Sequence, residues 1–320
     1  MNNSILVLVI ASGVAYGTPL LYAALGELLA ERSGVLNLGV EGMMLVGAVM
    51  GFWTVQRVNA GSALSLTVAI LVAAVFGALM ASILAFLVIT LRASQIVSGL
   101  ALTIFAGAAG LSSYLGNDLN LASNPASHTF QPIFPSSMQN WPIVGPILFA
   151  QNALVYASWV LVALVWIYLG RTRPGLNVRA VGEAPAAADA MGISVVAYRY
   201  AHVLVGGAFA GVAGATFTLA ITPQWVDGIT GGAGWIAIAL VIFAFWRPEL
   251  CLVGAYFFGA LQALPSQLQA REVHIGPSEL YNALPYVMTI LVLVLVSTGW
   301  AKRRLGAPAA LGVPYVREER

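Results

Sequence analysis

The sequence has very little charge. Only 8% of its 320 residues are Asp, Glu, Lys or Arg, whereas 60% are hydrophobic and the mean hydropathy is +0.88. A soluble domain holds roughly 45–50% apolar residues, so an ordinary soluble protein is excluded. Several uncharged runs reach about 18 residues or more, which is enough to cross a hydrocarbon core about 30 Å thick. The runs do not alternate between polar and apolar positions, so we predict an all-α polytopic membrane protein.

Several chemical motifs are also missing. The single lysine, Lys302, follows no glycine-rich turn, so a G-x-x-x-x-G-K-[ST] phosphate loop is absent and the chain has no ATPase site of its own. The H-E-x-x-H and G-x-S-x-G patterns are absent as well. One cysteine, Cys251, excludes a disulfide framework, and three scattered histidines fit no zinc-ligand spacing. We therefore predict no catalytic residue, no metal site and no cofactor in this chain.

The apolar runs predict a single transmembrane domain, residues 1–320, with about nine crossings (eight to ten). The N-terminus lacks a positive segment, so it reads as the first crossing rather than as a cleaved signal peptide. Two short runs on either side of Arg247-Pro248-Glu249 leave the count open. The predicted crossings are residues 4–29, 35–55, 63–90, 94–114, 152–170, 200–222, 235–246, 250–264 and 280–300.

Basic residues predict the orientation, because cytoplasmic loops carry the excess of Lys and Arg. With the N-terminus outside and the C-terminus cytoplasmic, twelve of the 14 basic residues fall inside and only Arg57 and Arg271 outside. Residues 171–199 then form a cytoplasmic loop, and residues 301–320 form a cytoplasmic tail.

One carboxylate stands in an apolar crossing. Glu41 lies nine residues after Arg32, so at 1.5 Å per helical residue it would lie roughly 13 Å deep. An ionised carboxylate there costs at least about 2.5 kcal/mol, so it should face the bundle interior. Asn37 is expected on the same helical face, although nearby glycines also permit an unwound segment. Two interpretations stay open: the pair lines or braces a substrate path, or Glu41 makes a buried structural hydrogen bond.

Three further residues are candidates for a substrate path. Gln95 and Ser98 are spaced i, i+3 on one helix and could equally join helices to each other. Trp235 could stack on a base or a sugar ring, or belong to an interfacial aromatic belt.

Small residues predict close contacts between helices. Small-xxx-small patterns allow two backbones to approach each other in lipid, and bundle packing is their ordinary role. The patterns are Gly47–Gly51 and Gly207–Gly211.

The cytoplasmic loop contains the signals of a short helix over residues 185–191. Pro185 suits its first position, Gly192 suits the left-handed position after its end, and Glu183 precedes it near the positive end of the dipole. Such a helix either docks into a groove of a partner or is a solvated linker.

Four segments together resemble a known family. Residues 182–193, with the pattern G-E-x-P-x-A-A-x-x-x-G-I, resemble the coupling loop of bacterial ABC-importer permeases for ribose, other simple sugars, nucleosides and branched-chain amino acids. Residues 31–48, 87–101 and 231–248 resemble further segments of this subfamily in the same order. Asn-Leu-Gly-Val-Glu-Gly (37–42) departs from the branched-chain amino acid version, and Asn37 stands where ribose-type members have Asp. The nucleoside branch is therefore the most similar, which implies a nucleoside or related simple sugar as the substrate. A ribose-like sugar or a branched-chain amino acid is the alternative.

The resemblance implies a permease subunit in a bacterial cytoplasmic membrane, with a small-molecule substrate and no nucleic acid polymer as partner. It implies a cytoplasmic ATPase that binds the ATP, a second permease subunit in a homo- or heterodimer, and an extracytoplasmic binding (lipo)protein. A bulky charged residue at Ala187 or Ala188 is expected to block ATPase docking without disturbing the fold. The residues implied in coupling are Gly182, Glu183, Pro185, Ala187, Ala188, Asp189, Met191 and Gly192.

Two other classes of protein stay open. An ion-coupled secondary transporter could use Glu41 as a proton or sodium site, and dependence on an ion gradient rather than on ATP would identify it. A membrane-embedded enzyme would need His202 or Asp189 as a catalytic group, but no spaced acid–base pair supports it.

Overall fold

The protein is described here by a computed structural model that covers residues 5–58, 60–270, 283–284, 287–291, 294 and 306–316. These residues form helices and one isolated β-bridge, with no strand among them. The helices are α1 (Ile5–Arg32), α2 (Val40–Arg57), α3 (Ser62–Ala85), α4 (Gln95–Ala106), α5 (Leu111–Asp118), α6 (Ser136–Gln139), α7 (Ala153–Arg171), α8 (Arg173–Glu183), α9 (Pro185–Ala190), α10 (Val195–Thr216), α11 (Ala233–Phe243) and α12 (Pro248–Gln269).

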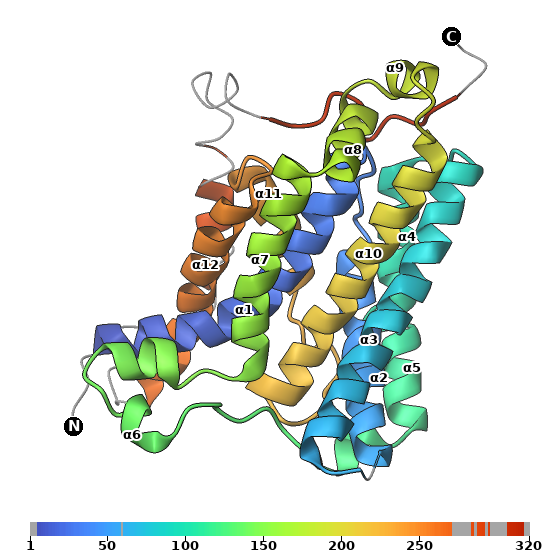
Figure 1. Ribbon diagram of the computed structural model, residues 1–320. Helices are drawn as coiled ribbons and strands as arrows, with labels where there is room; N and C mark the ends of the chain where they lie inside the picture. Colours follow the sequence, from blue (N-terminus) through green and yellow to red (C-terminus); the bar gives the residue numbers. More distant parts are fainter. Residues whose placement is uncertain are drawn as a thin grey trace.

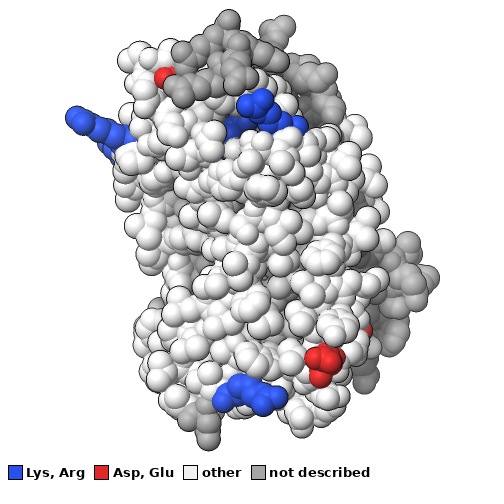
Figure 2. All heavy atoms as spheres, turned by 90° about the vertical axis from the view of Figure 1, so that its right-hand side faces the viewer, with Lys and Arg blue, Asp and Glu red and all other residues white. Residues whose placement is uncertain are grey.

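Within the described part of the chain, five helical segments are long and apolar enough to cross a membrane, and π-helical turns extend two of them. Figure 2 shows charged side chains near the two ends of one face and a broad band without them in between. An all-α protein with helices long and apolar enough to cross a membrane is thus confirmed, while the number of crossings stays a prediction. Of the predicted crossing 280–300 the structure describes only residues 283–284, 287–291 and 294, and these are helical. The five segments are Ile5–Arg32, Ser62–Thr90, Gln95–Asp118, Ala153–Arg171 and Val195–Ile221.

Glycines bring α2, α3 and α10 into backbone contact. A Cβ atom added to Gly47 would lie 2.4 Å from the Cα of Gly211, and one added to Gly211 would lie 2.1 Å from the carbonyl oxygen of Ala73. A Cβ atom on Gly207 would lie 2.6 Å from the carbonyl oxygen of Gly77. Side chains larger than hydrogen do not fit at these crossings, so α10 packs directly on the backbones of α2 and α3.

The second part of the bundle is built around α1. This helix runs obliquely through the molecule, with α12 on one side and α10 on the other (Figure 1). A Cβ atom on Gly17 would lie 2.5 Å from the carbonyl oxygen of Ala255, so α1 and α12 also touch through their backbones. The end of α1 reaches the same end of the molecule as α8 and α9 (Figure 1).

Several predicted boundaries are wrong. The second crossing begins at Val40 rather than at residue 35, because the chain turns through Gly34 with a φ of +88°. The predicted crossing 94–114 corresponds to the segment Gln95–Asp118, within which residues 107–110 separate α4 from α5. The predicted crossing 250–264 is longer at both ends, because Pro248 occupies the first turn of α12, where a missing N–H costs nothing.

Candidate functional site at the loop before α2

An unwound loop, residues 33–39, connects α1 to α2. Asn37 lies in this loop and is fully buried, and its Oδ1 accepts a hydrogen bond of 3.0 Å from the N–H of Gly39. This is the Asx turn that asparagine favours. The predicted shared helical face of Asn37 and Glu41 is therefore wrong, because Glu41 is in the first turn of α2 and Asn37 precedes the helix. The unwound segment that the nearby glycines permit is present instead.

Neighbouring helices satisfy the backbone of this loop. Gln95 of α4 accepts a hydrogen bond of 2.7 Å from the N–H of Leu36, and Thr103 donates one of 2.7 Å to the carbonyl of Leu38. Glu27 of α1 accepts one of 3.0 Å from the N–H of Asn37. An unwound segment inside a membrane protein needs such partners, because lipid offers none.

Helix α4 approaches the loop closely. A Cβ atom on Gly99 would lie 2.9 Å from the backbone nitrogen of Leu38, and Ser98 beside it is buried. Gln95 and Ser98 thus lie at the contact between α4 and the loop, and the hydrogen bond of Gln95 fixes that contact.

Glu41 binds the start of α11. Its Oε1 accepts hydrogen bonds from the Oγ1 of Thr230 at 2.6 Å and the N–H of Gly232 at 2.9 Å, and its Oε2 accepts one from Gly234 at 2.7 Å. Glu41 is 7% exposed. A carboxylate at a helix N-terminus meets free N–H groups and the positive end of the dipole, which offsets much of the cost of burial.

The glycines before α11 make this arrangement possible. Gly232 has a φ of +82° at the N-cap of α11, a conformation that side chains with a Cβ rarely adopt. A Cβ atom on Gly234 would lie 2.8 Å from the Oε2 of Glu41 and 2.6 Å from its backbone nitrogen. Trp235 follows directly and is 39% exposed.

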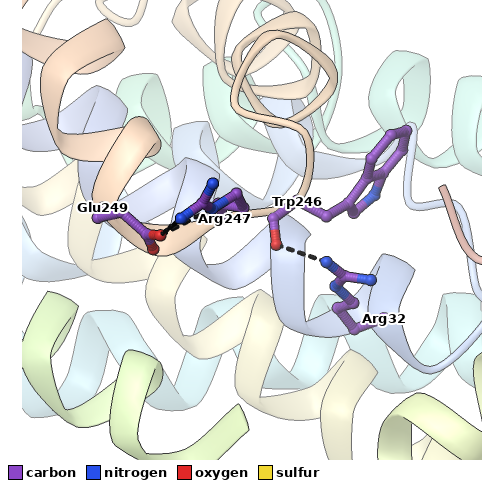
Figure 3. A network of polar contacts seen from close by, with 4 residues as sticks. All are labelled: Arg32, Trp246, Arg247 and Glu249. Atoms are coloured by element: carbon purple, nitrogen blue, oxygen red, sulfur yellow. Dashed lines mark hydrogen bonds and ion pairs between the residues drawn. The ribbon is translucent and has the colours of Figure 1, made fainter. Parts of the chain in front are cut away.

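The other end of α11 is held by the end of α1. The carbonyl of Trp246 accepts a hydrogen bond of 2.8 Å from the Nη2 of Arg32 (Figure 3), and its indole Nε1 donates one to Glu31. Phe245 and Trp246 both have positive φ, at 51° and 53°, so this corner is a strained backbone turn. Arg247 and Glu249 form an exposed ion pair beside it (Figure 3).

Sequence reasoning missed the acids of α1. Glu27 and Glu31 are each only 1% exposed and are spaced i, i+4, so they lie on one face of the helix. Glu27 holds the loop through Asn37, and Glu31 holds the corner through Trp246. Two acids four residues apart within an apolar run were the signal that could have revealed them.

The short helix of the 171–199 loop is present as α9, with Gly192 at a φ of +81° after its end. Ala187 is exposed and Met191 is 82% exposed, but Ala188 is only 4% exposed and packs against Val181 and Val195. The expectation that a large residue at Ala188 leaves the fold intact is therefore wrong, because Ala188 faces the protein.

Among the described residues, both ring nitrogens of His202 have partners other than a carboxylate. Its Nε2 lies 2.8 Å from the hydroxyl of Tyr168, and its Nδ1 lies 2.7 Å from the carbonyl oxygen of Tyr198. The Nε2 contact thus joins α10 to α7, and the Nδ1 contact lies within α10, a pattern that fits a buried structural histidine.

These features define a class of protein: a helical membrane protein whose unwound segments lie inside the bundle and are held by buried polar side chains, as at transport sites. The family described as branched-chain amino acid transport system / permease component matches residues 9–293. The chain belongs to this permease family, as the motif resemblance predicted.

Individual relatives extend over nearly the whole chain. The "Putative glucose ABC transporter permease protein TsgC13" of Haloferax volcanii is 41% identical over 95% of this chain and 96% of its own length. The nucleoside ABC transporter permease protein NupC of Lactococcus lactis subsp. cremoris is 34% identical over 98% of both chains. The guanosine ABC transporter permease protein NupQ of Bacillus subtilis is 33% identical over 99% of this chain and 98% of its own length. No solved structure matches the chain.

Proposed function

We propose that this chain is the permease subunit of an ATP-binding-cassette importer and forms the translocation path for a nucleoside or a related simple sugar. The similarity over nearly the full length to permeases named for nucleosides, guanosine and glucose carries the proposal. These solutes share a polar ring that bears several hydroxyl groups, so one kind of path can serve them.

Within the predicted path residues, the proposal assigns two roles. Trp235 contacts the passing solute, because its indole is partly exposed and presents a flat apolar face to a base or a sugar ring. Asn37, Glu41, Gln95 and Ser98 position the loop and the start of α11, which is supported by their burial and by the hydrogen bonds of three of them.

The proposed coupling element is α9. An ATPase subunit docks on its exposed face, which presents Ala187 and Met191. A second permease subunit and an extracytoplasmic binding protein complete the proposed importer. The cytoplasmic side is the end that carries α8 and α9, and the position of Arg32, Arg171 and Arg173 at this end supports that orientation.

Gentle affinity purification from native membranes, followed by mass spectrometry, tests the proposal. We expect a stoichiometric ATPase of the ATP-binding-cassette type, together with a second permease subunit. Small molecules released from the co-purified binding protein would then identify the solute as a nucleoside or a sugar. Purification of the chain alone in several detergents, with uptake that follows an ion gradient, would contradict the proposal and favour the secondary transporter.

A further inference from the structure

The C-terminal residues 306–316 lie against the parts of the chain that surround α9. They run past α8 and α9 at one end of the molecule (Figure 1). Arg32, the last residue of α1, donates a hydrogen bond of 3.1 Å to the carbonyl of Gly306. The N–H of Ala310 donates one of 2.9 Å to the carbonyl of Gly182 at the end of α8. We call residues 306–316 the strap.

The strap, α1 and α8 meet at Gly182. A Cβ atom on this glycine would lie 2.3 Å from the carbonyl oxygen of Arg32 and 3.2 Å from the Cβ of Pro308. Glu183 follows, and its Oε2 accepts a hydrogen bond of 3.2 Å from the N–H of Ala309. Two of the residues that the sequence assigned to coupling therefore bind the strap.

A buried arginine fixes the middle of the strap. Arg199 of α10 is only 2% exposed, and its Nη1 donates a hydrogen bond of 3.1 Å to the carbonyl of Val313. Its Nε and Nη2 have no hydrogen-bond partner within the described part of the chain. Burial of a guanidinium costs free energy. Displacement of the strap would take the Val313 carbonyl away from Arg199 and so raise the cost of burying this cation.

The end of the strap packs against the cluster that contains the buried residue of α9. Tyr315 contacts the small cluster of Val181, Ala188 and Val195, in which Ala188 is the only buried residue of α9. Tyr315 is the member of this cluster that comes from outside the 171–199 loop and α10. The position of such a short helix therefore depends on the strap as well as on its own neighbours.

Arg32 joins the strap to the corner after α11. Arg32 donates to Gly306 through Nη1 and to the carbonyl of Trp246 through Nη2. Contacts thus run from the cluster around Ala188 of α9 through Tyr315 and the strap to Arg32. From Arg32 they continue to Trp246 and α11, whose other end binds Glu41.

We propose that residues 306–316 are a positioning strap, anchored by Tyr315, Arg199 and Arg32, that holds α9 in place and links its movement to the α11–α12 corner. This inference rests on the proposed function for the source of the movement, an ATPase docked on α9. The anchoring of α9 itself does not depend on the identity of the partner.

Tyr315 offers a matched pair of variants. Its hydroxyl is buried without a hydrogen-bond partner among the described residues, so Tyr315→Phe keeps the packing, whereas Tyr315→Ala removes it. Met191→Cys can carry a nitroxide at the exposed end of α9, because the native Cys251 is buried. We expect the label to move faster in Tyr315→Ala and at the wild-type rate in Tyr315→Phe. Equal label mobility in both variants would contradict the proposal that the strap holds α9.

The functional readout is transport by the intact complex, in which residue 191 carries its native Met. We expect Tyr315→Ala to lower transport about tenfold, which corresponds to about 1.4 kcal/mol, with the thermal unfolding of the chain unchanged.

A chain ending at residue 305 should behave like Tyr315→Ala, and a chain ending at residue 316 like the wild type. Wild-type transport by Tyr315→Ala, or loss of its folded chain from the membrane, would overturn the proposal. If the wild-type chain binds no ATPase while the label is still mobilised by Tyr315→Ala, the strap stands and the proposed function fails.

Discussion

Glu41 shows how a costly residue in a membrane protein becomes a structural anchor. Its two oxygens accept hydrogen bonds from Thr230, Gly232 and Gly234, on an element that lies about 190 positions away in the sequence. The carboxylate thereby ties the first turn of α2 to the first turn of α11. Its burial and its partners favour a brace over a site that holds a moving ion.

Substitutions at Glu41 should show whether its hydrogen bonds to the start of α11 stabilise the protein. Glu41→Ala leaves three donors without an acceptor, at about 1–3 kcal/mol each. Glu41→Gln keeps one acceptor oxygen, but its NH₂ group cannot accept from the second side of the site. We expect thermal stability and transport to fall in the order wild type, Gln, Ala. Wild-type behaviour of both variants would show that Glu41 is not a brace.

Trp235 should act on the solute rather than on the fold. Because its indole is partly exposed, Trp235→Ala should raise the KM of transport severalfold and change the unfolding temperature little. Trp235→Phe, which keeps an aromatic face, should retain more of the affinity. A KM unchanged in Trp235→Ala would remove this residue from the path.

At the scale of the elements, two kinds of contact hold the protein together. Glycines seat α10 against α2 and α3 without intervening side chains. Buried polar groups hold the unwound pieces, namely the 33–39 loop and both ends of α11. Where two helices touch through their backbones, a larger side chain does not fit. On the exposed face of α9, a larger side chain does fit.

The helix crossing predicts a sharp contrast between two glycines. Gly211→Ala would place a Cβ atom 2.1 Å from the carbonyl oxygen of Ala73, so the helices must separate, at a cost of about 1–3 kcal/mol. Gly170→Ala is the control, because a Cβ atom there meets nothing within 4 Å and alanine favours the helix. Thermal unfolding in detergent should show loss of stability only for Gly211→Ala. Equal unfolding temperatures would contradict the close crossing.

The two neighbouring alanines of α9 should respond differently to arginine. Ala187→Arg changes an exposed position, so the chain should fold normally but lose its co-purifying ATPase. Ala188→Arg forces a charge into the cluster with Val181 and Val195, so its own thermal stability should fall. Retention of the ATPase by Ala187→Arg at normal expression would exclude docking on this face.

At the scale of the whole molecule, the described arginines other than Arg57 gather at the end that carries α9. Arg57 at the end of α2 lies at the opposite end from α9. The band between the two ends in Figure 2 carries no charge on the face shown, as a surface in contact with lipid requires.

The proposed orientation can be measured with single cysteines. The native Cys251 is fully buried, so an impermeant maleimide should not label the wild-type chain in intact cells. We expect Arg57→Cys to be labelled from outside, and Met191→Cys only after the membrane is permeabilised. The reverse pattern would place α9 outside and would exclude a cytoplasmic ATPase on it.

The sequence alone predicted the features that depend on residues close to one another in the chain. The long apolar runs were sufficient to predict membrane-crossing helices, and Pro185 and Gly192 defined the short helix of the loop. The helical pairing of Glu41 with Asn37 was wrong, because Gly34 turns the chain and α2 begins only at Val40, whereas the unwound segment that the glycines permit is present. Periodicity cannot detect a break that long-range hydrogen bonds stabilise.

Only the tertiary structure decided which groups meet. The partners of Glu41 lie near residue 232, those of Glu31 and Arg32 lie near residue 246, and the strap reaches α9 from the end of the chain. Such contacts depend on the packing of helices that are distant in the sequence, and no spacing along one helix encodes them. The sequence therefore determined the class of protein and its helices, and the fold determined the connections between them.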